Sequence, residues 1–158
     1  RVSQWMNPWG DTGGQLSETW YALAWGGVAG TGIGLGRPGK IPYVESDFIF
    51  AAIGEELGLL GGTAILIAYL LIVGSGLKIA TQSDHAFDKL LAAGLTALIG
   101  MQAFVILAGV IRLLPLTGVV LPFVSYGGSA LVANYVLLAL LLRISDGNSR
   151  ARRAAAVA

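Results

Sequence analysis

The sequence feature that most constrains the fold is an uncharged apolar run from Leu57 to Leu77. A run of that length and polarity is typical of a helix that crosses a lipid bilayer. A second run covers residues 90–111, and a third, 130–142, is shorter. At 1.5 Å per residue the third run reaches about 20 Å against a bilayer core of about 30 Å, so its span must begin earlier, within 120–129. The sequence therefore predicts membrane-spanning helices at 48–77, 90–111 and 120–142.

Composition favours an integral membrane protein over a soluble domain. Of the 158 residues 55% are hydrophobic and 12% are charged, whereas a soluble domain carries about 25% charged residues. The lack of cysteine excludes a disulfide framework and a thiolate metal site. The chain begins at Arg1 with no start methionine or signal peptide, so we interpret it as the C-terminal part of a larger membrane protein. The net charge of +1 says little about partners, since what matters is where the charges fall. We expect the membrane, and no nucleic acid, as a partner.

Carboxylates gather where the first span begins. Asp47, Glu55 and Glu56 lie near the expected boundary between water and lipid. A carboxylate there is costly unless it is solvated, paired or used, so each is a functional candidate. For Glu55 and Glu56 the alternative is that they only mark a helix start, where the macrodipole favours anions. For Asp47 a functional role is preferred, mainly because of the family resemblance described below.

Residues 1–47 are expected to form a polar, glycine-rich loop outside the membrane. Residues 15–25 can form a short amphipathic helix with Leu16, Trp20 and Leu23 on one face. We expect this helix to lie on the membrane surface, because aromatic side chains settle at the level of the headgroups. A helix packed on the rest of the loop is the alternative.

The loop also contains a pattern that imitates a nucleotide site. Residues 34–40 satisfy G-x-x-x-x-G-K, but Ile41 stands where Ser or Thr is required. Neither the preceding strand nor the following helix of a phosphate-binding loop is predicted, so we expect no nucleotide cofactor. The glycines more plainly allow a tight loop that folds against the membrane. Arg37 and Lys40 are candidates for contact with an anionic lipid headgroup.

Hydroxyl groups and glycines open the third span, at Ser125, Tyr126, Gly127 and Gly128. Irregular backbone at membrane depth is tolerated only when it is buried in protein or faces a watery cavity, so we expect these residues to line a cavity. A tight turn opened by Pro122 is the alternative. In the second span Gln102 is expected to bond to a neighbouring helix, with a substrate contact as the alternative.

The distribution of basic residues sets the expected orientation. With three spans, residues 1–47 and the C-terminal tail lie on opposite faces. The positive-inside rule favours a cytoplasmic tail, which places Asp47 at the outer face. The expected inner residues are Lys78, Lys89, Arg143, Arg150, Arg152 and Arg153, against Arg1, Arg37, Lys40 and Arg112 outside. The tail itself is expected to be disordered.

Two long motifs resemble a known family. The runs DFIFAAIGEELGLLG (47–61) and RLLPLTGVVLPFVSYGGSALVANY (112–135) resemble the RodA/FtsW/SpoVE family, also called the SEDS proteins. These are polytopic bacterial inner-membrane proteins of cell shape, elongation, division and sporulation. The resemblance covers nearly all of residues 1–146. The amino-acid sequence of residues 112–118 resembles that of RodA-like members, especially actinobacterial ones, more than that of division-specific members.

The resemblance implies a ten-span all-α bundle, of which this chain is the last three spans and the large extracellular loop before them. It implies a peptidoglycan glycosyltransferase that polymerises lipid II, carried on undecaprenyl diphosphate, together with a class B penicillin-binding protein as partner. The family's essential aspartate lies in the D-F-I-F motif and maps onto Asp47. Division-type members often carry lysine where Thr117 stands, so no role of that lysine is carried over.

Lipid II is α-linked and the polymer is β-linked, so the implied reaction inverts the sugar. Asp47 can be the base that deprotonates the acceptor hydroxyl, or it can hold a divalent cation, Mg²⁺ or Mn²⁺, against the diphosphate. Residues 125–128 are candidates for contacts with the sugar or headgroup. A lipid II flippase and a non-catalytic scaffold that activates a penicillin-binding protein remain alternatives.

The expected segments are 1–47 (outer loop), 48–77 (span), 78–89 (inner loop), 90–111 (span), 112–119 (outer loop), 120–142 (span) and 143–158 (tail).

Overall fold

The computed structural model describes residues 5–6, 14–32, 34–35, 49–111, 113–115 and 118–157. Its elements in chain order are α2 (Gly14–Gly26), α3 (Ile49–Thr81), α4 (Ala86–Val110) and α5 (Gly128–Val157), and the described residues contain no β-strand. Three of these helices are long and apolar enough to cross a membrane: Ile49–Thr81, Ala86–Val110 and Gly128–Ala154. The expected all-α membrane fold is confirmed.

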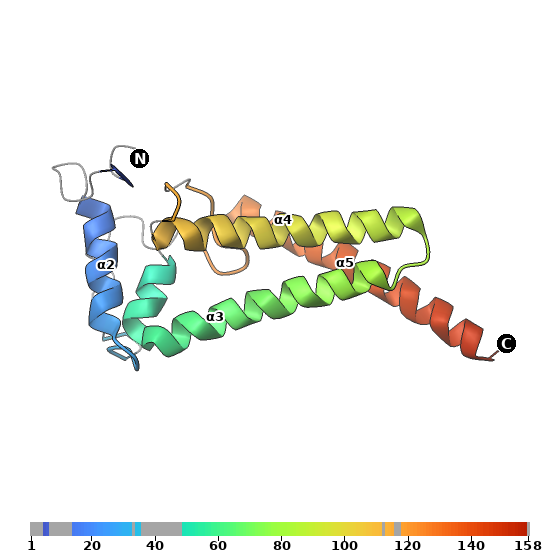
Figure 1. The fold of residues 1–158 in the computed structure, drawn as a ribbon, viewed down its shortest axis with the longest axis horizontal. Helices are drawn as coiled ribbons and strands as arrows, with labels where there is room; N and C mark the ends of the chain where they lie inside the picture. Colours follow the sequence, from blue (N-terminus) through green and yellow to red (C-terminus); the bar gives the residue numbers. More distant parts are fainter. Residues whose placement is uncertain are drawn as a thin grey trace.

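The spanning helices form a bundle with two distinct ends (Figure 1). Helices α3 and α4 run antiparallel and are joined by the short connection 82–85, and α5 runs alongside them with the C-terminus at the same end as that connection. We call this the turn end. The opposite end carries α2, which lies across the bundle, and the connection from α4 to α5; we call it the loop end.

Small residues allow α3 and α4 to approach closely. A methyl group at Gly76 would overlap the Thr96 Oγ1 atom, and one at Gly100 would lie 3.1 Å from a methyl of Val73. Thr96 is almost fully buried, and its hydroxyl donates to the Ala92 carbonyl at 2.7 Å. Such contacts are typical of helices that associate in membranes, where close packing replaces the hydrophobic effect.

Among the residues that the structure describes, buried side chains form a cluster toward each end of the bundle. The cluster toward the turn end joins all three long helices, and the one toward the loop end fixes the connection before α5. Their members are Ala80, Ala92, Leu95, Ile99, Leu141 and Ile144 in the first, and Tyr69, Ala103, Ile106 and Leu121 in the second. Large apolar side chains such as Leu70, Met101 and Val132 point outward and are mostly exposed, as expected of helices surrounded by lipid or by further helices.

Helix α5 continues to Val157, where the sequence analysis expected a disordered tail. Alanine and arginine are strong helix formers, and Asp146 pairs with Arg150 one turn on at 2.8 Å. The Asn148 side-chain amide also donates to the Ser83 hydroxyl at 2.9 Å and to the Ile79 carbonyl at 3.1 Å. These contacts attach the polar part of α5 to the turn end.

Candidate functional site

Helix α3 is broken at Gly58, whose φ of 65° and ψ of −159° are not helical. The segment before the break, residues 49–57, turns away from the rest of α3 and lies beside α2 (Figure 1). In a continuous helix the Leu59 and Leu60 amides would donate to the Glu55 and Glu56 carbonyls. The break separates these four backbone groups, so each needs another partner.

A loop after α2, residues 27–32, supplies those partners, and we call it the clamp loop. It accepts hydrogen bonds from the two amides after the break and donates to the two carbonyls before it. The bonds are Leu59 N–H to the Gly27 carbonyl at 3.0 Å, Leu60 N–H to the Val28 carbonyl at 3.3 Å, Thr31 N–H to the Glu55 carbonyl at 2.9 Å, and Gly32 N–H to the Glu56 carbonyl at 3.0 Å.

The backbones approach so closely at the clamp that two positions require glycine. Gly30 and Gly58 both have positive φ, at 81° and 65°, a conformation that side chains with a Cβ rarely adopt. A methyl at Gly30 would overlap the Glu56 carbonyl oxygen, and one at Gly58 would overlap the Gly30 nitrogen. The sequence analysis interpreted this glycine-rich stretch as a loop folded against the membrane; its described part folds against the break in α3.

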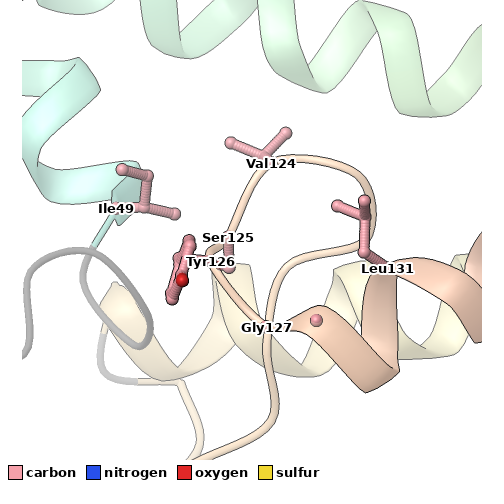
Figure 2. Close-up of a pocket in the computed structure, with 7 residues that line it drawn as sticks. Ile49, Val124, Ser125, Tyr126, Gly127 and Leu131 are labelled. Carbon is pink, nitrogen blue, oxygen red and sulfur yellow. The ribbon is translucent and has the colours of Figure 1, made fainter.

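A pocket of about 510 Å³ lies at the loop end, between the start of α3 and the start of α5 (Figure 2). The expected cluster Ser125, Tyr126, Gly127 and Gly128 lines it together with Ile49, Val124 and Leu131. The structure thus brings all four of these candidate residues to one cavity. The alternative expectation is also visible, because residues 122–124 form a turn directly before them.

Three side chains hold this turn in place. The Tyr69 hydroxyl donates to the Pro122 carbonyl, and the Gln102 amide donates to the Val120 carbonyl at 3.1 Å. Gln102 therefore bonds to the connection before α5, not to a neighbouring helix as expected. The Ser125 hydroxyl accepts from the Leu121 amide at 2.9 Å. Since Ser125 is also buried, its hydroxyl shapes the wall of the pocket.

The turn contains an unusual backbone conformation at Phe123, which has a φ of 64° without being glycine. Its ring meets that of Tyr135 edge to face, with centroids 5.6 Å apart. Conformations of this kind persist only where surrounding contacts over-determine them.

Tyr126 is the side chain best placed to meet a ligand in the pocket. It is 80% exposed, and Figure 2 shows its ring beside Ile49. A ring with a terminal hydroxyl can pack on an apolar surface and still form a hydrogen bond.

The other sequence-predicted site residues, Asp47, Arg37 and Lys40, lie outside the described residues. Asp47 stands two positions before Ile49, which lines the pocket. In the part of the chain that the structure describes, no three His, Asp or Glu side chains come together as a metal site. A role of Asp47 as a ligand of a divalent cation therefore stays a prediction.

We expect Tyr69→Phe to destabilise the protein by about 1 kcal/mol, because it removes the donor to the Pro122 carbonyl. The midpoint of thermal unfolding in detergent would measure this. Tyr135→Phe is the matched control, since Tyr135 is more than half exposed and the change keeps its ring beside Phe123. Equal midpoints for the two variants would contradict the structural role of Tyr69.

Comparisons with known proteins agree with the motif resemblance. The model of the FtsW/RodA/SpoVE family, described as "Cell cycle protein", matches residues 1–150. "Peptidoglycan glycosyltransferase RodA" of Mycobacterium bovis is 49% identical over 156 residues, which are 97% of this chain and 33% of that protein. "Probable peptidoglycan glycosyltransferase FtsW" of Geobacter sulfurreducens is 41% identical over 150 residues, which are 92% of this chain and 40% of that protein.

A solved structure shows the same arrangement of helices. It is described as "Structural coordination of polymerization and crosslinking by a peptidoglycan synthase complex". Its matching chain superposes with a TM-score of 0.79 at 28% identity, over 94% of this chain and 41% of that chain. The present chain spans about a third to two-fifths of the length of the relatives that it matches. The greater similarity to a mycobacterial RodA than to the Geobacter FtsW agrees with the expected actinobacterial, RodA-like character. The chain belongs to the FtsW/RodA/SpoVE family of membrane proteins.

Proposed function

We propose that this chain is part of a peptidoglycan glycosyltransferase that polymerises lipid II into glycan strands at the outer face of the bacterial cytoplasmic membrane, for cell elongation and shape or for division. The relatives named above as peptidoglycan glycosyltransferases support this activity. The observation that carries the proposal is the pocket at the loop end, where residues 125–128 meet Ile49, two positions after Asp47.

The proposed reaction needs few protein groups. The hydroxyl of the acceptor sugar attacks the anomeric carbon of the donor from the face opposite the diphosphate. The bond to the diphosphate breaks, and the diphosphate leaves with the electron pair. Asp47, as general base, accepts the proton of the attacking hydroxyl. If a divalent cation is bound there instead, it supplies charge neutralisation for the diphosphate. Tyr126, exposed in the pocket, would pack on a sugar ring.

The orientation of the chain in the membrane is part of the proposal. Six basic residues lie at the turn end or beyond it on α5: Lys78, Lys89, Arg143, Arg150, Arg152 and Arg153. Because cytoplasmic segments carry the excess of Lys and Arg, the turn end would be cytoplasmic. The pocket at the loop end would then face the exterior, where lipid II is polymerised.

Helix α2 would lie in the outer membrane interface. The Leu23 side chain packs toward Gly54, and the Trp20 ring donates to the Val110 carbonyl at 3.3 Å. Trp20 and Leu23, two residues of the face expected to meet the membrane, thus pack on the bundle, whereas Tyr21 and Trp25 are exposed at 56% and 76%. A spin label at position 25 is expected to be more accessible to oxygen than to a water-soluble nickel reagent. A label at His85 in the turn should show the reverse, and equal profiles would contradict the interfacial position.

A class B penicillin-binding protein is the proposed partner. Its support is that the structurally similar chain comes from a peptidoglycan synthase complex that joins polymerisation to crosslinking.

The deciding experiment uses the full-length protein, purified and reconstituted with lipid II and no second polymerase. Glycan strands on a gel would support the enzyme. Their absence, with stimulation of an added polymerase, would favour the scaffold and overturn the proposal. Transport of labelled lipid II by protein that carries Asp47→Asn and makes no strands would favour a flippase.

A further inference from the structure

We propose that the clamp loop is a positioning device for the glycosyl transfer reaction: it holds the first segment of α3, and with it Ile49, against the pocket, and Thr31 contributes a side-chain hydrogen bond to this hold. The catalytic part of this inference depends on the proposed function. The mechanical part, that the loop fixes the segment, depends only on the structure.

The helical segment from Ile49 to Leu57 depends on contacts with other parts of the chain for its position. It makes about two and a half helical turns, and an isolated helix of that length is marginal. The break at Gly58 removes the hydrogen bonds that would fix its direction relative to the rest of α3. Its position therefore depends on the neighbours that it touches.

Ile49, at the start of the segment, packs against the cluster of Tyr69, Ala103, Ile106 and Leu121, and the rest of the segment meets α2 and the clamp loop. Gly26 at the end of α2 lies so close to the segment that a methyl there would overlap the Gly54 carbonyl oxygen. Immediately afterwards in the chain, the clamp loop forms its four backbone hydrogen bonds across the break. The segment is thus held at its middle and at its end.

Thr31 adds a side-chain hydrogen bond to this clamp. Its hydroxyl donates to the Glu55 carbonyl at 3.1 Å, and its backbone amide donates to the same oxygen at 2.9 Å. Glu55 is buried, with 8% of its surface exposed. Loss of the hydroxyl removes one of the two Thr31 donors to this partly buried carbonyl, and water has reduced access to replace it.

The clamp connects distant parts of the molecule to the pocket wall. Trp20 ties α2 to the C-terminal end of α4, and α2 leads directly into the clamp loop. The loop fixes the break, and the segment before the break presents Ile49 to the pocket. A shift of the segment would move Ile49 in the pocket wall, and Asp47 stands only two residues before Ile49 in the sequence. A misplacement of about 1 Å in a reacting group can reduce a rate about 100-fold.

The test uses four variants of the full-length protein. Gly30→Ala forces the clamp apart, and Thr31→Val removes the hydroxyl with little change in volume. Thr31→Ser restores the hydroxyl. Gly34→Ala is the matched control, because Gly34 also has positive φ, at 77°, but a methyl there would meet no atom within 4 Å.

Two readouts separate position from activity. The first is the distance between spin labels at Ala52, in the short segment, and Ser129, at the start of α5. We expect Gly30→Ala and Thr31→Val to shift or broaden this distance, whereas Thr31→Ser and Gly34→Ala leave it unchanged. The second is lipid II polymerisation. We expect kcat to fall about 3- to 10-fold for Thr31→Val and further for Gly30→Ala, with KM changed less than about 2-fold, because the clamp positions the reacting group.

The outcomes are distinguishable. Equal label distances in Gly30→Ala, Thr31→Val and the Gly34→Ala control would overturn the clamp. Shifted distances with unchanged kcat would overturn the positioning role. A full rate for Asp47→Asn would refute the catalytic assignment of the proposed function and the catalytic part of this inference with it, and the label distances would still decide the mechanical part. Thr31→Val preserves the test if Gly30→Ala does not fold.

Discussion

Asp47→Asn in the full-length protein is expected to reduce the rate of lipid II polymerisation by at least about 100-fold. The amide keeps the shape of the side chain but removes both its basicity and its charge, and a positioned general base contributes about 100- to 10,000-fold. The same loss is expected if the carboxylate binds a cation. The measurement is the initial rate of glycan synthesis by purified, reconstituted protein.

Asp84→Asn is the control for this substitution. Asp84 is an exposed carboxylate in the turn between α3 and α4, at the end of the bundle opposite the pocket. Its variant should polymerise lipid II at the normal rate. A near-normal rate for Asp47→Asn as well would refute the catalytic assignment.

The largest effect on stability is expected at the contact between α3 and α4. Gly76→Leu places a bulky side chain where even a methyl would overlap Thr96 Oγ1. The two helices would have to separate, and overpacking of this kind costs up to about 3 kcal/mol. We expect a clear fall in the midpoint of thermal unfolding in detergent.

Gly74→Leu offers a control on the same helix. A methyl at Gly74 would meet no atom within 4 Å, so the larger side chain has room and the helix propensity improves. A midpoint for Gly76→Leu that matches that of Gly74→Leu would contradict the close packing of the two helices.

The three spanning helices could be predicted from the sequence because a helix needs a long uncharged run of residues to cross the hydrocarbon core of a bilayer. The cluster at 125–128 could be predicted as part of a pocket for a related reason, since hydroxyls and glycines stand out in an apolar segment. Both predictions depend on which residue types occur in a stretch, and the sequence displays that directly.

The clamp could not be predicted in the same way. It joins residues 27–32 to residues 55–60 through backbone groups, which every residue carries, so no side-chain pattern reveals the pairing. The sequence shows a glycine at position 58, but glycine is common in membrane helices and does not by itself indicate a break in the helix. The positive φ that distinguishes Gly58 appears only in the structure.

The helical C-terminal part of α5 was missed for a different reason. The prediction of disorder came from a tail of alanines and small polar residues after Arg143, although alanine and arginine both have high helix propensity. The contacts that decide the outcome include Asn148 with Ser83, which are 65 positions apart in the chain. Such a contact follows from the packing of α5 on the turn end and not from the local sequence.

The most direct test of the central claim, that the pocket at the loop end receives lipid II, is photo-crosslinking in the full-length protein. A photoreactive phenylalanine analogue at Tyr126, which is exposed in the pocket, should capture labelled lipid II. The same analogue at Phe87, exposed at the turn end, should not. Equal capture at the two positions, or capture at Phe87 alone, would contradict the account.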